Sequence, residues 1–279
     1  MPHATTTESA TVVESTERSL SAAQKVFAVL DALYRARRPM TLSDIGRATA
    51  LSLTTVHRIL GELVEWGGLE RVDDGKYRIG LHMWELGSLA PRSTGLVDAA
   101  LPFLEDLYEA THGNVRLAVR EGSEVIFVSH LSGHDSVPLR TRAATRLPMP
   151  TTGVGLVLLA HAPVDVRREV LEQNVPRFTP YTVPDSGTLR RMLADVRKNG
   201  YAVCDRQMTS DAVSVAAPIR TLNGDVVAAV SVAVQGAGHA AVRRHIPAVL
   251  MAARGISRTI DRMPEPARLA YIRSHRSSA

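Results

Sequence analysis

Residues 41–80 constrain the fold of this chain more than any other segment, because two short amphipathic helices and a hairpin follow one another there without a gap. Thr41 is placed to cap the first helix and Ser52 the second, since a hydroxyl at such a position accepts a bond from a free backbone N–H. A Gly-Gly pair ends the second helix, and an Asp-Asp-Gly turn then joins two strands of alternating character. This order of elements predicts a helix-turn-helix followed by a β-hairpin wing, an arrangement that presents its second helix to the major groove of DNA.

The second helix has an apolar side and an open side. Leu53, Val56 and Leu60 recur at helical spacing and are expected to face the core. The polar residues of the open side, together with the two caps and two cations of the wing, are the candidate DNA contacts: Thr41, Ser52, Thr54, Thr55, His57, Arg58, Lys76 and Arg78. Arginine can donate two parallel bonds to guanine, and threonine and histidine can reach base edges or phosphate oxygens. Ordinary packing of two helices in another kind of domain is the alternative, but an interior helix pair has no use for such a face.

The net charge of +5 agrees with a nucleic-acid partner without requiring one. Residues 19–92 contain ten Lys and Arg against eight Asp and Glu, a net of only +2, so the positive charge is not concentrated around the helix-turn-helix. The prediction of DNA binding therefore depends on the pattern of residues and not on bulk charge.

The chain of 279 residues is long enough for one small and one medium domain, and 45% of its residues are hydrophobic, enough for a buried core. Its apolar stretches are too short to span a bilayer, so no membrane partner is expected. The first eighteen residues are polar, lack the pattern of a secretory signal and are expected to form a disordered arm. The single cysteine, Cys204, allows no internal disulfide and no cysteine-based metal site. Together these features predict a cytoplasmic protein.

Proline and glycine mark the divisions of the chain. A first helix over 20–34 would support the helix-turn-helix, and a linker helix continues from the wing. The sequence Pro-Arg-Ser-Thr-Gly at 91–95 is expected to end that linker, before a new helix over 96–111. The expected parts are a disordered arm (1–18), the winged helix-turn-helix domain (19–80), the linker helix (81–95), a larger domain (96–262) and a tail (263–279).

The larger domain alternates between strand-like and helix-like patterns. Its expected strands cover 115–119, 125–131, 137–142, 201–205, 213–220 and 226–234. Its expected helices cover 154–161, 164–173, 189–199 and 239–262. The Asn-Gly pair at 223–224 is a strong hairpin signal, and the first two strands meet at a Glu-Gly turn. The pattern indicates a mostly antiparallel sheet with helices around it, an α+β sensory domain.

Five motifs in this order resemble those of the isocitrate-lyase-regulator (IclR) family of bacterial transcription factors. They are the winged helix, YRIGLHMWELG, LPMPTTGVGLVLLA, LRRMLADVRKNGYAV and the run AAPI followed by NGDVVAAVSVAV, and they span residues 19–262. The resemblance implies an N-terminal winged helix and a C-terminal effector-binding domain with a GAF-like fold. It also implies a homodimer or a dimer of dimers that binds double-stranded operator DNA. Such proteins mostly repress and sometimes activate catabolic operons in response to a small organic acid.

Three positions depart from the family pattern. Leu156 stands where members usually have a lysine after the glycine that opens the effector-domain helix. Without that cation, an anion in the cavity would depend more on backbone N–H groups at the helix start. Ser214 replaces a common cysteine, and Leu53 replaces a basic or polar residue early in the recognition helix. Operator and effector are therefore expected to differ from those of well-known members.

By motif position, the resemblance places the effector against the sheet and under the loop that leads into the effector-domain helix. The implied lining residues are Thr151, Thr152, Gly153, Val154, Gly155, Asp205, Ser214 and Ser231, with Leu147, Met149 and Val213 as apolar neighbours. A helix N-terminus attracts a carboxylate, and hydroxyls on an apolar surface supply the few polar contacts of a small-molecule site. Each assignment has a structural alternative: the threonines could cap the helix, the serines could be tolerated on a half-exposed strand, and Asp205 could cap a strand end. Cys204 is expected to be a core residue and not a sensor, because no second thiol accompanies it.

An enzyme is the rival class. The sequence has ten histidines and many carboxylates, but no metal-ligand spacing, no Gly-x-Ser-x-Gly elbow and no phosphate loop. No catalytic residue, metal or cofactor is therefore expected. A DNA-binding protein without an effector is a second rival, and the size of the second domain argues against it. The expectation is a repressor whose effector is a small organic acid, with aromatic acids among the candidates.

Overall fold

The computed structural model describes residues 20–89, 91–133, 145–183, 185–236 and 238–263. The chain divides into two compact units, Met1–Gly87 and Ser88–Ala279. The expected arm over 1–18, the strand over 137–142 and the tail beyond residue 263 lie outside the described residues. No helix within the described ranges is long and apolar enough to cross a membrane.

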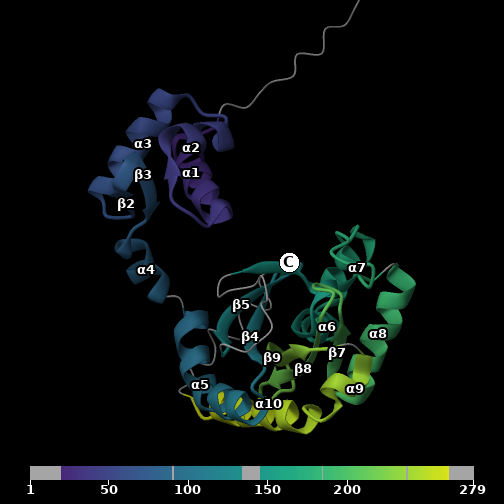
Figure 1. The fold of residues 1–279 in the computed structure, drawn as a ribbon. Coiled ribbons are helices and arrows are strands. Elements are labelled where there is room, and N and C mark those ends of the chain that lie inside the picture. The colour runs from purple at the N-terminus through teal and green to yellow at the C-terminus, as the bar shows by residue number, and fades with distance from the viewer. Residues whose placement is uncertain (1–19, 90, 134–144, 184, 237, 264–279) are drawn as a thin grey trace, which may run out of the picture. The chain divides into compact units, whose positions relative to one another are not determined.

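The first unit contains a small helical core and a three-stranded sheet (Figure 1). The helices are α1 (Ala22–Ala36), α2 (Leu42–Thr49), α3 (Leu53–Glu65) and α4 (Leu81–Ser88), and the strands are β1 (Met40–Thr41), β2 (Leu69–Val72) and β3 (Lys76–Ile79). β3 pairs antiparallel with both β2 and β1. β1 is too short for its sequence to show the alternation of a strand. The predicted order of helix, turn, helix and hairpin is confirmed.

Both predicted caps of the helix-turn-helix are present. The Thr41 hydroxyl accepts a hydrogen bond from the Asp44 N–H at 3.1 Å, and the Asp44 carboxylate accepts one from the Thr41 N–H. The Ser52 hydroxyl accepts a hydrogen bond from the Thr55 N–H at 3.3 Å. Between the helices, Ala50 adopts a left-handed conformation with a φ of 55°, which turns the chain sharply. Each cap satisfies a backbone N–H that lacks a partner inside its helix, so the start of α3 is fixed.

The expectation that Leu53 faces the core is wrong. Its side chain is 52% exposed. The buried residues of α3 are Val56, Ile59, Leu60 and Leu63. The reason is position: Leu53 is the first residue of α3, at the end of the core, and it lies against the buried Gly46 of α2. A Cβ on Gly46 would come within 2.9 Å of the Leu53 side chain, so glycine lets the two helices approach closely here.

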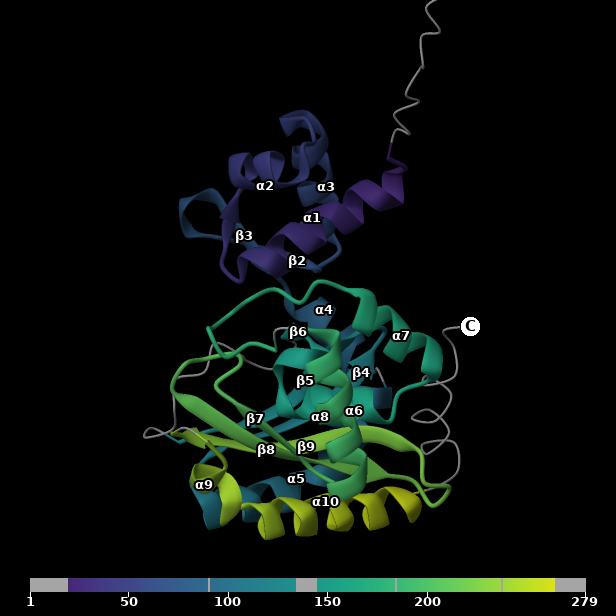
Figure 2. The same cartoon turned by 90° about the vertical axis from the view of Figure 1, so that its right-hand side faces the viewer.

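The second unit is built on a six-stranded sheet in which neighbouring strands are antiparallel (Figure 2). Its strands are β4 (Asn114–Glu121), β5 (Glu124–Leu131), β6 (Arg146–Pro148), β7 (Ala202–Asp205), β8 (Ala212–Arg220) and β9 (Val226–Gln235). Across the sheet their order is β6-β5-β4-β9-β8-β7. Both predicted hairpins are confirmed, with Gly122 (φ 59°) between β4 and β5 and Gly224 (φ 84°) between β8 and β9.

Helices cover both faces of this sheet. α5 (Pro91–Thr111) and α10 (Ile246–Asp261) lie along one face (Figures 1 and 2). The other face carries α6 (Gly153–Ala160), whose residues are all buried, with α8 (Ser186–Asn199) packed against it. A short 3₁₀ turn (Met149–Thr151) leads into α6, and α7 (Val164–Glu172) and α9 (Gly238–Arg243) lie further along the chain. This is the α+β class that the sequence predicts, and covering both faces buries the central strands on both sides.

The start of α5 and the break between α9 and α10 are two differences from the expected helices that proline explains. α5 begins at Pro91 and not at Leu96, because proline is tolerated in the first turn of a helix, where its missing N–H is not needed. The helix expected over 239–262 is broken into α9 and α10. Pro247 lies in the first turn of α10, and in a continuous helix its ring would clash with the carbonyl of Arg243.

Candidate functional site

The open side of α3 and the wing carry the residues expected to contact DNA. Thr54, His57 and Arg58 are exposed on α3. Arg78 is exposed on β3, and Lys76 at the start of β3 is partly exposed. These five side chains are therefore accessible to a nucleic acid.

The other three expected contacts have structural roles. Thr41 and Ser52 are the helix caps, and the Thr55 hydroxyl lies 2.9 Å from the Ser52 hydroxyl. These hydroxyls fix the start of each helix, and any contact with DNA from them would be additional to that role.

Each of the three cations expected to contact DNA is paired with a carboxylate of its own unit. The pairs are Arg58 with Glu62 at 2.5 Å, Arg78 with Glu70 at 2.7 Å and Lys76 with Asp74 at 3.2 Å. All six side chains are between 40% and 79% exposed, so these pairs add little to the stability of the fold. A DNA phosphate has to compete with these carboxylates for each cation. This competition reduces the contribution of each cation to DNA affinity.

The second unit contains a cavity of about 440 Å³. Its walls come from the sheet, from the start of α6 and from the loops at 178–179 and 207–210. Eight of the eleven residues expected at an effector site line it: Leu147, Thr151, Thr152, Gly153, Val154, Val213, Ser214 and Ser231. The volume lies within the usual range of small-molecule sites.

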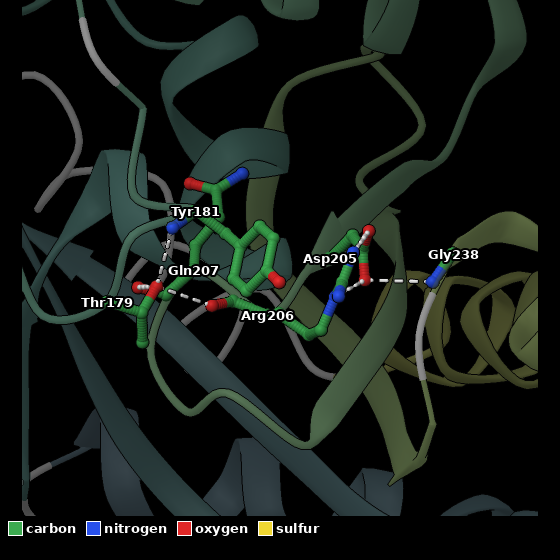
Figure 3. A network of polar contacts seen from close by, with 6 residues as sticks. All are labelled: Thr179, Tyr181, Asp205, Arg206, Gln207 and Gly238. Atoms are coloured by element: carbon green, nitrogen blue, oxygen red, sulfur yellow. Dashed lines mark hydrogen bonds and ion pairs between the residues drawn. The ribbon is translucent and has the colours of Figure 1, made fainter.

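Three expected residues do not line the cavity. Met149 is fully buried, and its backbone lies so close to Gly155 that a Cβ there would be 2.1 Å from the Met149 carbonyl oxygen. The Asp205 carboxylate is occupied elsewhere, because the Arg206 guanidinium donates to its two oxygens at 3.0 and 3.1 Å and the Gly238 N–H donates at 2.9 Å (Figure 3). These bonds hold the pKa of Asp205 below its usual value, and the bond from Arg206 has the largest effect. Motif position identifies the segment of chain but not the direction in which each residue faces.

The two threonines before α6 serve the fold as well as the cavity. The Thr152 hydroxyl accepts from the Gly155 N–H at 3.0 Å and is the cap of α6. The Thr151 hydroxyl donates to the Pro148 carbonyl at 2.9 Å. The capping alternative is therefore correct for Thr152, and one N–H of the helix start is already used within the protein.

A buried cation, which the sequence did not predict, is the main feature of the cavity. Arg116 of β4 lines the cavity and is 7% exposed, and its guanidinium carbon lies 5.1 Å from the centre of the Phe127 ring of β5. Burial lowers the pKa of Arg116 to about 10, which still leaves it protonated at neutral pH. Leu156, which replaces the lysine of the family pattern, is fully buried in the core. The positive charge of this cavity therefore comes from the sheet and not from the helix.

Cys204 also lines the cavity, and its chemistry is that of a core residue. Burial raises the pKa of its thiol to about 12, and the Sγ–H donates to the Thr151 carbonyl at 3.4 Å. A thiol with so high a pKa forms little thiolate and is unreactive. Within the described ranges, no three His, Cys, Asp or Glu side chains lie close enough together to hold a metal ion.

A winged helix-turn-helix followed by an α+β unit with a small-molecule cavity is the architecture of a DNA-binding transcriptional regulator. Residues 22–73 match the IclR helix-turn-helix domain, and residues 90–262 match the bacterial transcriptional regulator IclR C-terminal domain. The chain belongs to the IclR family. The resemblance inferred from its sequence is confirmed, and the second unit has the GAF-like fold that this resemblance implies.

Three relatives illustrate the range of the family. The HTH-type transcriptional regulator BhcR of Paracoccus denitrificans is 33% identical over 195 residues, which are 69% of this chain and 70% of BhcR. The HTH-type transcriptional repressor AllR of Escherichia coli is 26% identical over 219 residues, which are 77% of this chain and 80% of AllR. A crystal structure of an IclR homologue from Microbacterium hydrocarbonoxydans, complexed with 4-hydroxybenzoate, is 39% identical with a TM-score of 0.78 and covers 86% of this chain and 98% of that one. BhcR and AllR are both named as regulators of transcription.

Proposed function

We propose that this protein is a transcriptional repressor whose affinity for operator DNA is changed by a small aromatic acid bound in the cavity of its second unit. It acts in the cytoplasm as a homodimer or a dimer of dimers. Each winged helix reads one half of an inverted repeat, since proteins with two-fold symmetry bind sites with two-fold symmetry. Repression is favoured over activation because a bound winged helix can block polymerase by itself, and the relative AllR is named as a repressor.

The observation that carries the effector proposal is the position of Arg116 beside Phe127 in the cavity. A buried guanidinium offers two charge-assisted hydrogen bonds to a carboxylate. The phenylalanine ring offers an apolar face against which a second ring packs well. The relative from Microbacterium hydrocarbonoxydans is complexed with 4-hydroxybenzoate, an acid of this type.

The effector changes DNA affinity only if it binds two arrangements of the protein with different affinities. The cavity is bounded by the sheet, by the start of α6 and by two loops, so one ligand contacts all of them at once. We expect binding to favour one arrangement of these elements, and with it one spacing of the winged helices in the dimer. The ligand need not touch α3.

Arg58→Ala should lower operator affinity by about 1–3 kcal/mol and relax specificity at one base position, because Arg58 is exposed on α3 and can bond to a guanine. Lys76→Ala is the matched comparison, since loss of a phosphate contact weakens binding to all sequences and lowers the salt slope by about one. Fluorescence anisotropy with operator and scrambled duplexes at several salt concentrations measures both effects. Operator affinity that neither substitution changes would mean that α3 and the wing are not the DNA-binding face.

Deletion of the gene should raise expression from the target promoter, because a repressor that is absent no longer blocks polymerase. The promoter is found by selecting the genomic fragments that the purified protein binds, and a reporter fused to it measures expression. Expression that falls on deletion would make the protein an activator. If no aromatic acid relieves repression and none raises the melting temperature of the protein, then the protein binds DNA without an effector.

A further inference from the structure

A buried amide oxygen in the cavity wall has no hydrogen-bond partner among the described residues. Gln207, in the loop between β7 and β8, is 5% exposed and lines the cavity. Its side-chain oxygen Oε1 is buried and forms no hydrogen bond with any described residue. Most buried polar atoms in proteins have a hydrogen-bond partner, because a buried polar atom without one destabilises the fold. In a ligand cavity, such an atom is expected when its partner belongs to the ligand.

Hydrogen bonds hold the backbone on both sides of Gln207 in place. The lack of a partner for the side-chain oxygen Oε1 is therefore not the result of a poorly held loop. The Thr179 hydroxyl donates to the Arg206 carbonyl at 2.7 Å (Figure 3). The Thr182 hydroxyl donates to the Gln207 carbonyl at 2.9 Å. Two threonines of the loop before α8 thus fix the two carbonyls that flank the Gln207 backbone.

Arg206 is itself restrained by its side chain. Its φ of 52° is left-handed, a conformation that arginine rarely adopts. Its guanidinium lies 3.8 Å from the centre of the Tyr181 ring and is bonded to both Asp205 oxygens (Figure 3). An unfavourable backbone conformation that several contacts maintain is common at ligand-binding positions, where it fixes the direction of a side chain.

Gln207 and Arg116 reach the cavity from strands that are not neighbours in the sheet. Arg116 is on β4, Gln207 follows β7, and β9 and β8 lie between these two strands in the sheet. A ligand that reaches both residues needs a carboxylate at one end and an uncharged polar group at the other.

We propose that Gln207 selects effectors that carry a hydroxyl group at the end opposite their carboxylate, so that the ligand class is a hydroxylated aromatic acid. The inference rests on the proposed function, in which Arg116 binds the carboxylate. The ligand hydroxyl donates its hydrogen to Gln207 Oε1. A charged group does not suit this end, because the amide is neutral and Phe178 and Met208, which also line the cavity, are apolar. An ammonium would lose water there without gaining a counter-charge.

Isothermal titration calorimetry on the full chain tests the proposal with two matched ligand pairs, 4-hydroxybenzoate with benzoate and the longer 4-hydroxycinnamate with cinnamate. The hydroxylated acid of at least one pair should bind about tenfold to a hundredfold more tightly, because its counterpart leaves Oε1 buried without a donor. Gln207→Met keeps an unbranched side chain of similar length but removes the amide, and it should reduce this preference to about twofold or less. Asp211→Asn, an exposed residue of the same loop that does not line the cavity, is the control and should keep the preference.

The outcomes separate this inference from the proposed function. Equal affinities within both pairs, or a preference that Gln207→Met leaves unchanged, overturns the role of Gln207 while the acids still bind. Binding of none of the four acids overturns both proposals. Ligand-free Gln207→Met should melt at the same temperature as the unchanged protein or higher, because a buried atom without a partner has been removed. A lower melting temperature would mean that Oε1 has a structural partner, and it too would overturn the inference.

Discussion

Arg116→Met should weaken the binding of benzoate by about a hundredfold or more, while the affinity for neutral benzamide changes by about threefold or less. The guanidinium is buried, and its pKa of about 10 leaves it protonated at neutral pH. A hydrogen bond to a carboxylate in such an environment is strong, because little water competes with it. Benzamide has the same ring and almost the same shape but no charge, so it loses little when the cation is removed. Calorimetric titration of both ligands measures the difference.

Arg146→Met is the matched control for this substitution. Arg146 is on β6, its side chain is 43% exposed, and it pairs with Glu124 at 3.5 Å without lining the cavity. Removing it should change neither affinity. Arg116→Lys should recover part of the benzoate affinity, because the charge remains while the forked geometry is lost. If Arg116→Met binds benzoate as tightly as the unchanged protein, or loses both ligands equally, then Arg116 does not bind the carboxylate.

The helix-turn-helix could be predicted in detail because its determinants are local. The bonds at Thr41 and Ser52 each reach only three residues along the chain. The wing turns through left-handed conformations at Asp74 and Gly75, residue types that tolerate them. Leu53, where the core assignment fails, lies at a helix end, and there the extent of the core is decided by other parts of the fold.

Arg116 could not be assigned to the cavity from sequence because its surroundings come from distant segments. In β4, alternation places Arg116 and Arg120 on the opposite side from Val115 and Leu117, and in a half-exposed sheet that side faces water. Here both arginines are buried, at 7% and 4% exposure. Elements that follow much later in the chain, including α6 and the loop at 207–210, form the other walls of the cavity. The sequence around Arg116 does not predict these walls.

The contacts of the two glycines at the start of α6 could not be predicted from the sequence either. The sequence Gly-Val-Gly indicates that backbones or side chains approach closely, but not which partner each glycine has. Gly153 faces the sheet, where an added Cβ would be 2.9 Å from the Ser214 hydroxyl and 3.3 Å from Ala216. Gly155 faces the turn before the helix, where it would be 2.1 Å from the Met149 carbonyl oxygen and 2.6 Å from its Cα. Two residues that the motif treats alike therefore have different consequences when they are changed.

Gly155→Ala should destabilise the second unit by about 3 kcal/mol or more. The new methyl group would collide with backbone, which cannot rotate away, and Met149 is itself held among buried residues. The start of α6 would have to move away from the 3₁₀ turn, and the Thr152 cap bonded to the Gly155 N–H would be strained with it. Thermal and urea denaturation followed by circular dichroism measure the loss.

Gly153→Ala is the matched comparison, because it adds the same methyl group two residues earlier in α6. Its methyl group meets the Ser214 hydroxyl, which can rotate, and lies 3.3 Å from the Ala216 Cβ, which needs only a small shift, so it should cost only about 1 kcal/mol. Gly153 and Ser214 both line the cavity, so the substitution should also weaken binding of the aromatic acid. The two tryptophans, Trp66 and Trp84, are both in the first unit, so their fluorescence reports its unfolding separately from circular dichroism of the whole chain. Gly155→Ala should therefore lower the circular dichroism midpoint and leave the tryptophan midpoint almost unchanged. A folded Gly155→Ala protein with normal stability and a lost ligand response would instead place Gly155 in the effector site, as its motif position implies.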